Sequence, residues 1–325
     1  MIGFHDIEAA AARLDGIAVR TPLVRSHALD DAIGGTVLVK PECLQLTGSF
    51  KIRGAYNFLS QLDAGEAERG VVAFSSGNHA QGVAAAGRML GIRTTIVMPE
   101  DAPRAKLENT KRLGGEVITY DRYTGDREAI ARDIAERRNA VVVPSYDHDY
   151  IIAGQGTVGL EIARDCEALG IGPGHALICC GGGGLIAGSA TALRHVFPDV
   201  VVHTVEPEDF DDTARSLVSG QRERVADDAR SICDALQAHT PGKLTFEINR
   251  RLLGAGLVVS DDEVREAMRF AFRHLKMVVE PGGAVALAAL LAGRIDVAGQ
   301  TTVVVISGGN VDLEMYDEVQ REGSG

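Results

Sequence analysis

Positive charge and long apolar runs are both scarce in this chain of 325 residues. The 33 Lys and Arg are outnumbered by 45 Asp and Glu, which gives a net charge of −12 and an isoelectric point of about 5.2. This deficit argues against nucleic acid or an anionic membrane surface as a partner. No apolar stretch reaches about 18 residues without a charge, so we expect no membrane span and no membrane partner.

Cysteine is also sparse, and its pattern excludes a disulfide framework. The five cysteines are odd in number, contain no Cys-x-x-Cys pair, and include Cys179 and Cys180 within one apolar run. Such a pattern favours reduced thiols in the core of a cytoplasmic protein. The first residues turn quickly into a polar and apolar helical pattern, which does not predict a secretory signal peptide.

Short apolar runs are abundant, and they alternate with helical patterns along the chain. We predict an α/β architecture with two open, mostly parallel, twisted sheets and helices on both faces of each sheet. The predicted strands are 36–40, 71–74, 94–99, 116–120, 140–144, 176–180, 200–205, 256–259 and 301–306. The principal predicted helices are 6–14, 80–90, 105–113, 127–138, 156–169, 260–275 and 285–292. The carboxyl ends of such strands form the ligand crevice.

One lysine follows the sequence Thr47-Gly48-Ser49-Phe50 at a predicted loop-to-helix junction. Gly48 permits a turn, and Ser49 is a suitable helix N-cap. Lys51 is then placed in the first helical turn, where the helix dipole and burial beside Phe50 lower an amine pKa. A partly neutral lysine can attack a carbonyl and form a Schiff base. An ordinary solvated lysine at a helix start is the structural alternative.

Three further Gly-rich or Ser-rich segments follow apolar strands and are expected to meet the lysine in one crevice. Residues 75–79 open a helix, and their N–H groups suit a carboxylate. Residues 181–184 are four glycines at a helix start, which form a phosphate-binding cradle. This run is neither a dinucleotide fingerprint nor a Walker loop. The third segment, 307–310, begins with Ser307.

Together these segments resemble the fold-type II pyridoxal-phosphate enzymes, which are tryptophan synthase β-like. Within that family they are similar to the threonine and serine dehydratases, the serine racemases and the 3-hydroxyaspartate dehydratases. The matching segments, in family order, are 47–55, 75–82, 153–157, 181–185 and 307–310. The resemblance implies pyridoxal 5′-phosphate as cofactor and a homodimer. It also implies a large cofactor-binding domain of residues 1–69 and 147–325, and a small mobile domain of residues 70–146.

The resemblance implies a role for each matched position. Lys51 is the Schiff-base lysine and removes the substrate's α-proton. The remaining cofactor-binding positions are Phe50, Asn78, Gly181, Gly182, Gly183, Gly184, Leu185 and Ser307. Ser76, Asn78 and His79 surround the substrate carboxylate. Arg127 falls where racemases place a substrate-associated arginine, although a solvated helix face explains it equally well.

The implied activity is a lyase that dehydrates and deaminates L-threonine or L-serine to a 2-oxo acid and ammonia by β-elimination. A 3-hydroxyaspartate dehydratase and a serine or aspartate racemase are the alternatives within the family. Ser76 bears on this choice, because a hydroxyl on the ring face opposite Lys51 can reprotonate the α-carbon. A ligand-binding protein without catalysis is the alternative from another class.

An acidic segment, 206–212, follows the strand that ends near Val205. Such an oxygen-rich cluster suits Mg²⁺, or Ca²⁺ or Mn²⁺ in its place. The resemblance assigns Glu206, the Phe210 carbonyl and Asp212 as metal ligands. A solvated acidic loop is the plain alternative.

Overall fold

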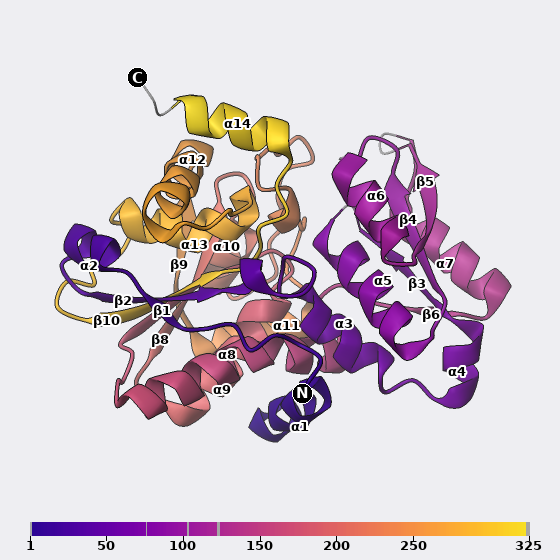
Figure 1. Cartoon of the computed structure of the whole chain (residues 1–325), viewed down its shortest axis with the longest axis horizontal. Coiled ribbons are helices and arrows are strands. Elements are labelled where there is room, and N and C mark those ends of the chain that lie inside the picture. Colours follow the sequence, from indigo (N-terminus) through magenta and orange to yellow (C-terminus); the bar gives the residue numbers. More distant parts are fainter. Residues whose placement is uncertain (1, 76, 103, 122–123, 323–325) are drawn as a thin grey trace.

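The computed structural model describes residues 2–75, 77–102, 104–121 and 124–322. Its strands form two separate sheets, which Figure 1 shows side by side. The larger sheet has the order β1 (Val24–Arg25), β2 (Thr36–Pro41), β10 (Thr301–Ile306), β7 (His175–Cys179), β8 (Val201–Pro207) and β9 (Leu253–Val259). All its neighbours run parallel except β1, which pairs antiparallel with β2. The smaller sheet is wholly parallel, in the order β5 (Glu116–Tyr120), β4 (Thr94–Pro99), β3 (Val71–Phe74) and β6 (Val141–Val142).

Helices cover both faces of each sheet, as predicted. The larger sheet packs against α13 on one face and α9 on the other, while α5 and α7 cover opposite faces of the smaller sheet. The helices are α1 (Phe4–Leu14), α2 (His27–Ile33), α3 (Lys51–Leu59), α4 (Ala64–Arg69), α5 (Asn78–Leu90), α6 (Arg104–Arg112), α7 (Arg127–Arg138), α8 (Asp149–Leu169), α9 (Gly184–Val196), α10 (Asp212–Ser219), α11 (Lys243–Leu252), α12 (Asp261–Phe270), α13 (Pro281–Leu291) and α14 (Leu313–Glu322). Among the described residues no helix is long and apolar enough to cross a membrane.

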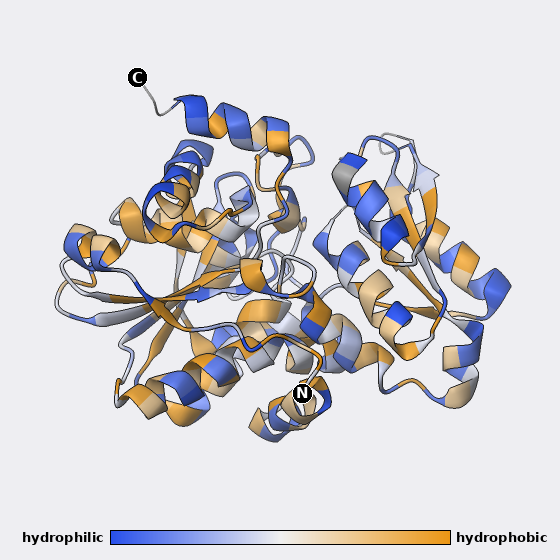
Figure 2. Cartoon of the chain, in the orientation of Figure 1, coloured by the Kyte–Doolittle hydropathy of each residue, from blue (hydrophilic) through white to orange (hydrophobic). Residues whose placement is uncertain are grey.

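The largest core lies between the central strands of the larger sheet and its helices. Figure 2 shows these strands as mostly hydrophobic along their length, which is typical of parallel strands buried on both faces. A second core joins the smaller sheet to α3, through Ile52, Ala55 and Phe58. The helix that begins at Lys51 therefore shares a core with the smaller sheet and packs against α5 and α8.

Three expectations about local structure need correction. The helix predicted from residue 156 begins at Asp149, because Gly154 and Gly156 let α8 pack tightly against α3 and α9. The strand predicted over 140–144 is only two residues long. Ser49 is not a helix cap: α3 begins after Phe50, and the buried Ser49 hydroxyl has no hydrogen-bond partner.

Other local expectations are confirmed. Gly48 adopts φ +71°, the left-handed conformation that the turn before Lys51 requires. Ser260 and Glu263 form a capping box at the start of α12. All five cysteines are free, and four of them are buried.

Candidate active site

The first and last predicted motifs meet in space. Backbone hydrogen bonds join Phe50 N–H to the Ser307 carbonyl at 3.2 Å and Gly309 N–H to the Gly48 carbonyl at 2.9 Å. These contacts follow from the parallel pairing of β2 with β10, whose carboxyl ends lie side by side. The loop before Lys51 is thus held directly against the segment that begins at Ser307.

The Lys51 amine is directed at the segment that follows β6. Its Nζ donates to the Ser145 carbonyl at 3.0 Å and lies 5.2 Å from the centroid of the Phe50 ring. Burial lowers the pKa of the Lys51 amine to about 8, against the smaller opposing effects of Cys179 and Glu280. The lowered pKa enlarges the fraction of neutral amine near physiological pH, and the neutral amine is the form that can act as a nucleophile or a base.

A buried ion-pair network fixes the helix that carries this lysine. The Arg53 guanidinium donates to both Glu42 carboxylate oxygens, at 2.7 and 2.8 Å, and to both Glu161 oxygens, at 2.6 and 2.9 Å. Lys40 adds a bond of 2.6 Å to Glu161. The bidentate geometry anchors the first turn of α3 to the residue that follows β2 and to α8, so Lys51 emerges from a rigid support.

The four glycines connect β7 to α9, and Gly183 adopts φ +93° at the helix N-cap. A Cβ at Gly182 would lie 2.3 Å from the Tyr146 ring, and one at Gly184 would lie 3.1 Å from Tyr146 Cβ. Side chains are therefore excluded along the turn. The first N–H groups of α9 have no partners within the helix, and together with its positive dipole end they suit a phosphate.

Sequence reasoning missed the loop that faces this turn. The Ser145 carbonyl accepts a hydrogen bond from the Lys51 amine, and Tyr146 packs on Gly182 and Gly184. Asp147 accepts hydrogen bonds from the N–H groups of residues 243–245 and so caps α11. A short apolar strand followed by Pro144 was the only signal at this position, and it did not indicate which groups would face the lysine.

Asn78 opens α5 and is buried, with its side chain held by Glu280, just before α13, and Asn310, after β10. Its amide nitrogen donates to Glu280 Oε1 at 2.6 Å, and its oxygen accepts from Asn310 at 2.8 Å. The adjacent His79 ring is buried against the Val143 carbonyl, at 3.2 Å from Nε2. Burial and the nearby Lys51 lower the pKa of His79 to about 3, so its ring is neutral. Ser76 lies outside the described residues.

Ser307 directly follows β10 and is buried. The Cys179 thiol at the end of β7 lies in hydrogen-bonding contact with Ser307. Leu185 is likewise buried, in the first turn of α9. Ser307 therefore lies next to the lysine loop, through its backbone contact with Phe50, and next to the end of β7, through Cys179.

Two cations lie on the side of the small sheet. Arg127 is exposed at the start of α7, 5.8 Å from the Phe74 ring, and its charge influences Tyr146 and His239. Lys106 from α6 is buried, and its Nζ lies 2.5 Å from Asp234 Oδ2. A Cβ on Gly77 would lie 3.5 Å from Lys106 Nζ. The structure thus puts a lysine beside the 75–79 segment that sequence analysis did not single out.

The predicted metal ligands lie away from Lys51, where β8 leads into α10. Glu206, Phe210 and Asp212 are all buried. Glu206 accepts from the N–H groups of Thr213 and Ala214, at 3.0 and 2.7 Å, while Asp212 Oδ2 has no partner. Burial and the neighbouring Asp212 raise the pKa of Glu206 well above its ordinary range, and burial raises that of Asp212 to about 7. Among the described residues no three His, Cys, Asp or Glu side chains form a metal cluster, and this set offers only two.

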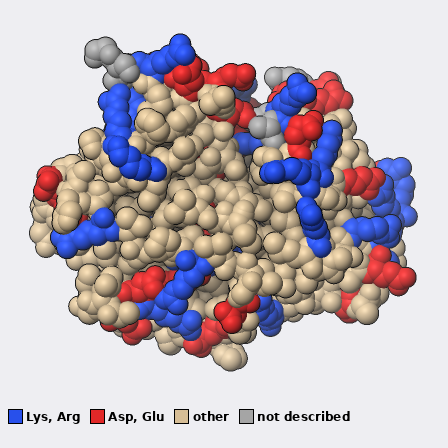
Figure 3. All heavy atoms as spheres, viewed as in Figure 1, with Lys and Arg blue, Asp and Glu red and all other residues tan. Residues whose placement is uncertain are grey.

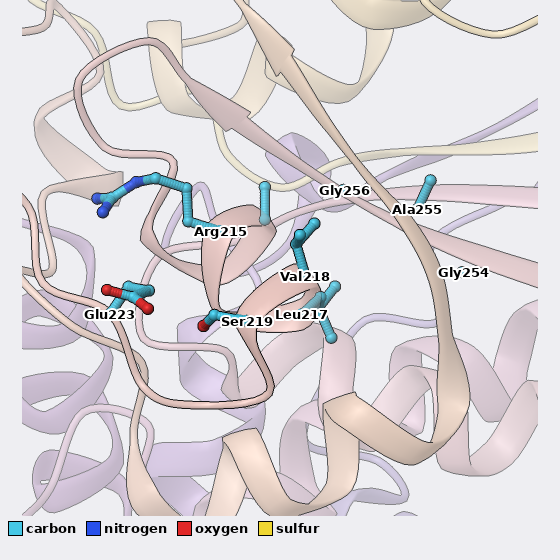
Figure 4. Close-up of a pocket in the computed structure, with 9 residues that line it drawn as sticks. Arg215, Leu217, Val218, Ser219, Glu223, Gly254, Ala255 and Gly256 are labelled. Carbon is cyan, nitrogen blue, oxygen red and sulfur yellow. The ribbon is translucent and has the colours of Figure 1, made fainter.

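A hollow of about 620 Å³ lies on the other side of α10, against β9. Figure 4 shows that it is lined mainly by small and apolar residues, with Arg215 and Glu223 at one side. None of the predicted site residues lines it, so we do not assign it to the active site.

The residues present fit pyridoxal 5′-phosphate. The glycine turn admits no side chains and presents a helix N-terminus to an anion. Both polar atoms of the buried Asn249 amide, beside Gly183, lack hydrogen-bond partners within the protein. An amine of lowered pKa, a fixed asparagine amide and a serine hydroxyl complete a set that matches an aldehyde, a ring hydroxyl and a ring nitrogen.

Comparison with known proteins gives the same answer for most of the chain. A family model described as pyridoxal-phosphate dependent enzyme matches residues 14–308. The L-threo-3-hydroxyaspartate ammonia-lyase of Pseudomonas sp is 46% identical over 96% of this chain and 97% of its own. The serine racemase of Schizosaccharomyces pombe is 41% identical over 96% of this chain and 95% of its own. The crystal structure of the T.th. threonine deaminase superposes with a TM-score of 0.90 at 40% identity, covering 96% of this chain and 99% of its own.

Proposed function

The chain belongs to the pyridoxal-phosphate dependent enzyme family, and from this premise we propose that it is an ammonia-lyase for small L-3-hydroxy amino acids. The first substrates are L-threonine and L-serine, which β-elimination converts to a 2-oxo acid and ammonia. One observation carries the proposal: the Lys51 amine, with a pKa lowered to about 8, donates to the carbonyl of Ser145, and the next residue, Tyr146, packs on the glycine turn that opens α9.

Bound pyridoxal phosphate supplies an aldehyde, which reacts with amines, and an aromatic ring, which withdraws electrons from the substrate's α-carbon. Lys51 Nζ is the base that accepts the α-proton, since it is enclosed and partly neutral at physiological pH. Ser307 offers a neutral hydroxyl to the ring nitrogen, where a carboxylate would hold a proton. Asn78 is assigned to the ring hydroxyl oxygen, Phe50 to the ring edge, and Gly181, Gly182, Gly183, Gly184 and Leu185 to the phosphate.

The substrate carboxylate is assigned to the N–H groups at the start of α5, including those of Asn78 and His79. The neutral His79 side chain donates to the protein backbone, so His79 acts through its N–H group. Arg127 stands at the rim, close enough to influence Tyr146, and we assign it to the outer part of the substrate.

A dicarboxylate substrate, 3-hydroxyaspartate, is the second candidate. The specific observation in its favour is the buried Lys106 beside Gly77, together with the 46% identity to an L-threo-3-hydroxyaspartate ammonia-lyase. A second carboxylate would compete with Asp234 for the Lys106 ammonium. We expect Lys106→Gln to lower kcat/KM for L-threo-3-hydroxyaspartate more than for L-threonine. An equal loss for both substrates would remove Lys106 from this role.

The hypothesis of a racemase activity depends on Ser76, which lies outside the described residues. We expect Ser76→Ala to abolish any racemisation and to spare elimination of L-substrates, because elimination requires a base on one face only. Chiral chromatography of the recovered amino acid measures racemisation, and 2-oxo acid release measures elimination. Loss of both to the same extent would refute the assignment of Ser76 to the opposite face.

We propose that Glu206, the Phe210 carbonyl and Asp212 hold Mg²⁺, or Ca²⁺ or Mn²⁺. Two buried carboxyl groups in one cluster, one with an unpartnered oxygen, support a cation there. The ion would be structural, since the cluster joins β8 to α10 and does not include Lys51.

We further propose a cytoplasmic homodimer. Five free cysteines suit a reducing compartment. Leu44, Leu46 and Val278 are 53%, 42% and 49% exposed. Leu44 and Leu46 lie between β2 and α3, and Val278 lies near that segment, since its carbonyl and Cys43 both adjoin Gly309. Figure 3 shows few charged side chains in the middle of the face it presents. Sedimentation of wild type and Leu44→Asp tests whether this surface forms the dimer interface. Identical sedimentation of the two proteins would exclude it.

The proposed function is tested by a panel assay of 2-oxo acid release. The substrates are L- and D-serine, L- and D-threonine and the hydroxyaspartate diastereomers, each with cofactor-loaded wild type and Lys51→Ala. We expect activity on the L-3-hydroxy amino acids with wild type and none with Lys51→Ala. A wild-type protein that stays colourless after cofactor addition, or a yellow protein inactive on every substrate, would overturn the proposal.

A further inference from the structure

The hydrogen bonds around Asn78 leave its amide one orientation. Asn310 Nδ2 donates to the Thr47 carbonyl at 2.7 Å and to Asn78 Oδ1 at 2.8 Å. Because a carbonyl can only accept, the nitrogen of Asn310 faces Thr47, and its second hydrogen then requires the oxygen of Asn78. The Asn78 nitrogen must therefore face Glu280 Oε1, at 2.6 Å. One of its two hydrogens is used there, and one remains.

Glu280 is built into the fold at this contact. It is the residue before α13, and its side chain is 1% exposed. A Cβ at Gly308 would lie 2.0 Å from Glu280 Oε1, so the glycine of the last motif leaves space for this carboxyl group. Glu280 makes no side-chain cap for α13; its N–H group donates to the Gly308 carbonyl at 3.2 Å, and its carboxyl group is in hydrogen-bonding contact with the backbone of Asn310.

We propose that Glu280 is a positioning residue: it orients the Asn78 amide so that the one remaining N–H faces the ligand ring. The inference rests on the proposed function, since the ligand atom concerned is the ring hydroxyl oxygen of pyridoxal phosphate. In this proposal Glu280 acts only through Asn78. It acts by accepting the first Asn78 hydrogen in a short hydrogen bond, which is strongest when the acceptor is a carboxylate.

The surroundings make this contact sensitive to pH. Burial raises the pKa of Glu280 to about 7. The positive charge of Lys106 acts to lower this pKa, and the negative charge of Asp234 acts to raise it. Lys51, Cys179 and Cys43 face the same carboxyl group from α3, β7 and the loop after β2. As the pH falls through about 7, Glu280 gains a proton and the charge-assisted bond to Asn78 weakens.

The test uses equilibrium dialysis of the apoprotein, so its readout does not depend on catalysis. The ligands are pyridoxal 5′-phosphate and its 3-deoxy analogue, which lacks only the ring hydroxyl group. The proteins are wild type, Glu280→Ala, Glu280→Gln and the control Asp312→Asn, which removes an acid near Lys106 without contacting Asn78. We expect Glu280→Ala to weaken binding of pyridoxal phosphate about tenfold and binding of the analogue less than twofold, and Asp312→Asn to change neither.

The Gln variant keeps a hydrogen-bond acceptor and loses the charge. We expect the preference of wild type for pyridoxal phosphate over the analogue to fall as the pH is lowered from about 8 to 6, and the Gln variant to lack this change. Equal weakening of both ligands in Glu280→Ala, or a pH dependence that survives in Glu280→Gln, would overturn the proposal. If wild type bound neither ligand, the proposed function itself would fail. Should Glu280→Ala not fold, the Gln comparison alone decides.

Discussion

Arg53→Met should be among the most damaging single changes outside the chemistry. Arg53 and Glu42 have side chains that are 1% and 0% exposed, and Glu161 is 17% exposed. The substitution keeps the volume and leaves Glu42 buried without its bidentate partner. Removing one member of a buried ion pair costs about 3–5 kcal/mol. This is a large share of the roughly 5–15 kcal/mol that stabilises a typical domain.

Urea unfolding followed by circular dichroism measures this loss, and Arg20→Met is the matched control. Arg20 also pairs with an aspartate, Asp165, but its side chain is 58% exposed, so the expected loss is about 0–1 kcal/mol. Arg53, Lys40 and Thr21 hold the pKa of Glu42 below its ordinary value against burial. In wild type, Glu42 therefore contributes stability above its unfolded pKa, and this is lost as the pH falls through the lower folded pKa.

In Arg53→Met, burial dominates, so the pKa of Glu42 should rise and its carboxyl group should protonate on acidification. The cost of the substitution is then smaller at about pH 5 than at pH 7. Adding Glu42→Gln should restore much of the stability at pH 7, because the uncompensated charge is gone. The reasoning fails if Arg53→Met costs no more than Arg20→Met, or if the double variant is as unstable as the single one.

Three further predictions concern the crevice and the metal cluster. Gly182→Ala should weaken cofactor binding at least tenfold, because the methyl group would lie 2.3 Å from the Tyr146 ring; Gly172→Ala, with open space around it, should bind like wild type in the same titration. Reductive methylation of Lys51 in the apoprotein, quantified by mass spectrometry, should reach half its maximal rate near pH 8; a midpoint near 10 would show an exposed, ordinary amine. EDTA should lower the thermal midpoint of wild type and leave Asp212→Ala unchanged, whereas a wild type indifferent to EDTA would exclude the metal.

The linear order of motifs was sufficient to predict that the segments around Lys51, Asn78 and Ser307 meet in space. Each apolar run marks a strand, each Gly-rich segment marks the turn after it, and parallel strands bring those turns to one edge. Lys51, Asn78 and Ser307 were found in this way. The lowered pKa of Lys51 followed from its place beside Phe50, although burial is the main cause.

The partners of these residues were not predictable in the same way. Glu280 contacts Asn78, and Tyr146 covers Gly182, across long separations in the chain. A glutamate before a helix and a tyrosine after a short strand have no periodic signal that indicates such contacts. Ser49 shows the opposite error: its residue type suits a helix cap, but tertiary packing began α3 one residue later.

The amino-acid sequence alone determined the strand and helix order, the glycine positions and the family, because these depend on local periodicity and on residues that only certain backbone conformations accept. Tertiary structure decided the orientation of the Asn78 amide, the burial of the Lys51 amine and the hydrogen-bond partner of the His79 ring. Those outcomes depend on side-chain directions and on burial, and both are fixed only when segments from distant parts of the chain pack together.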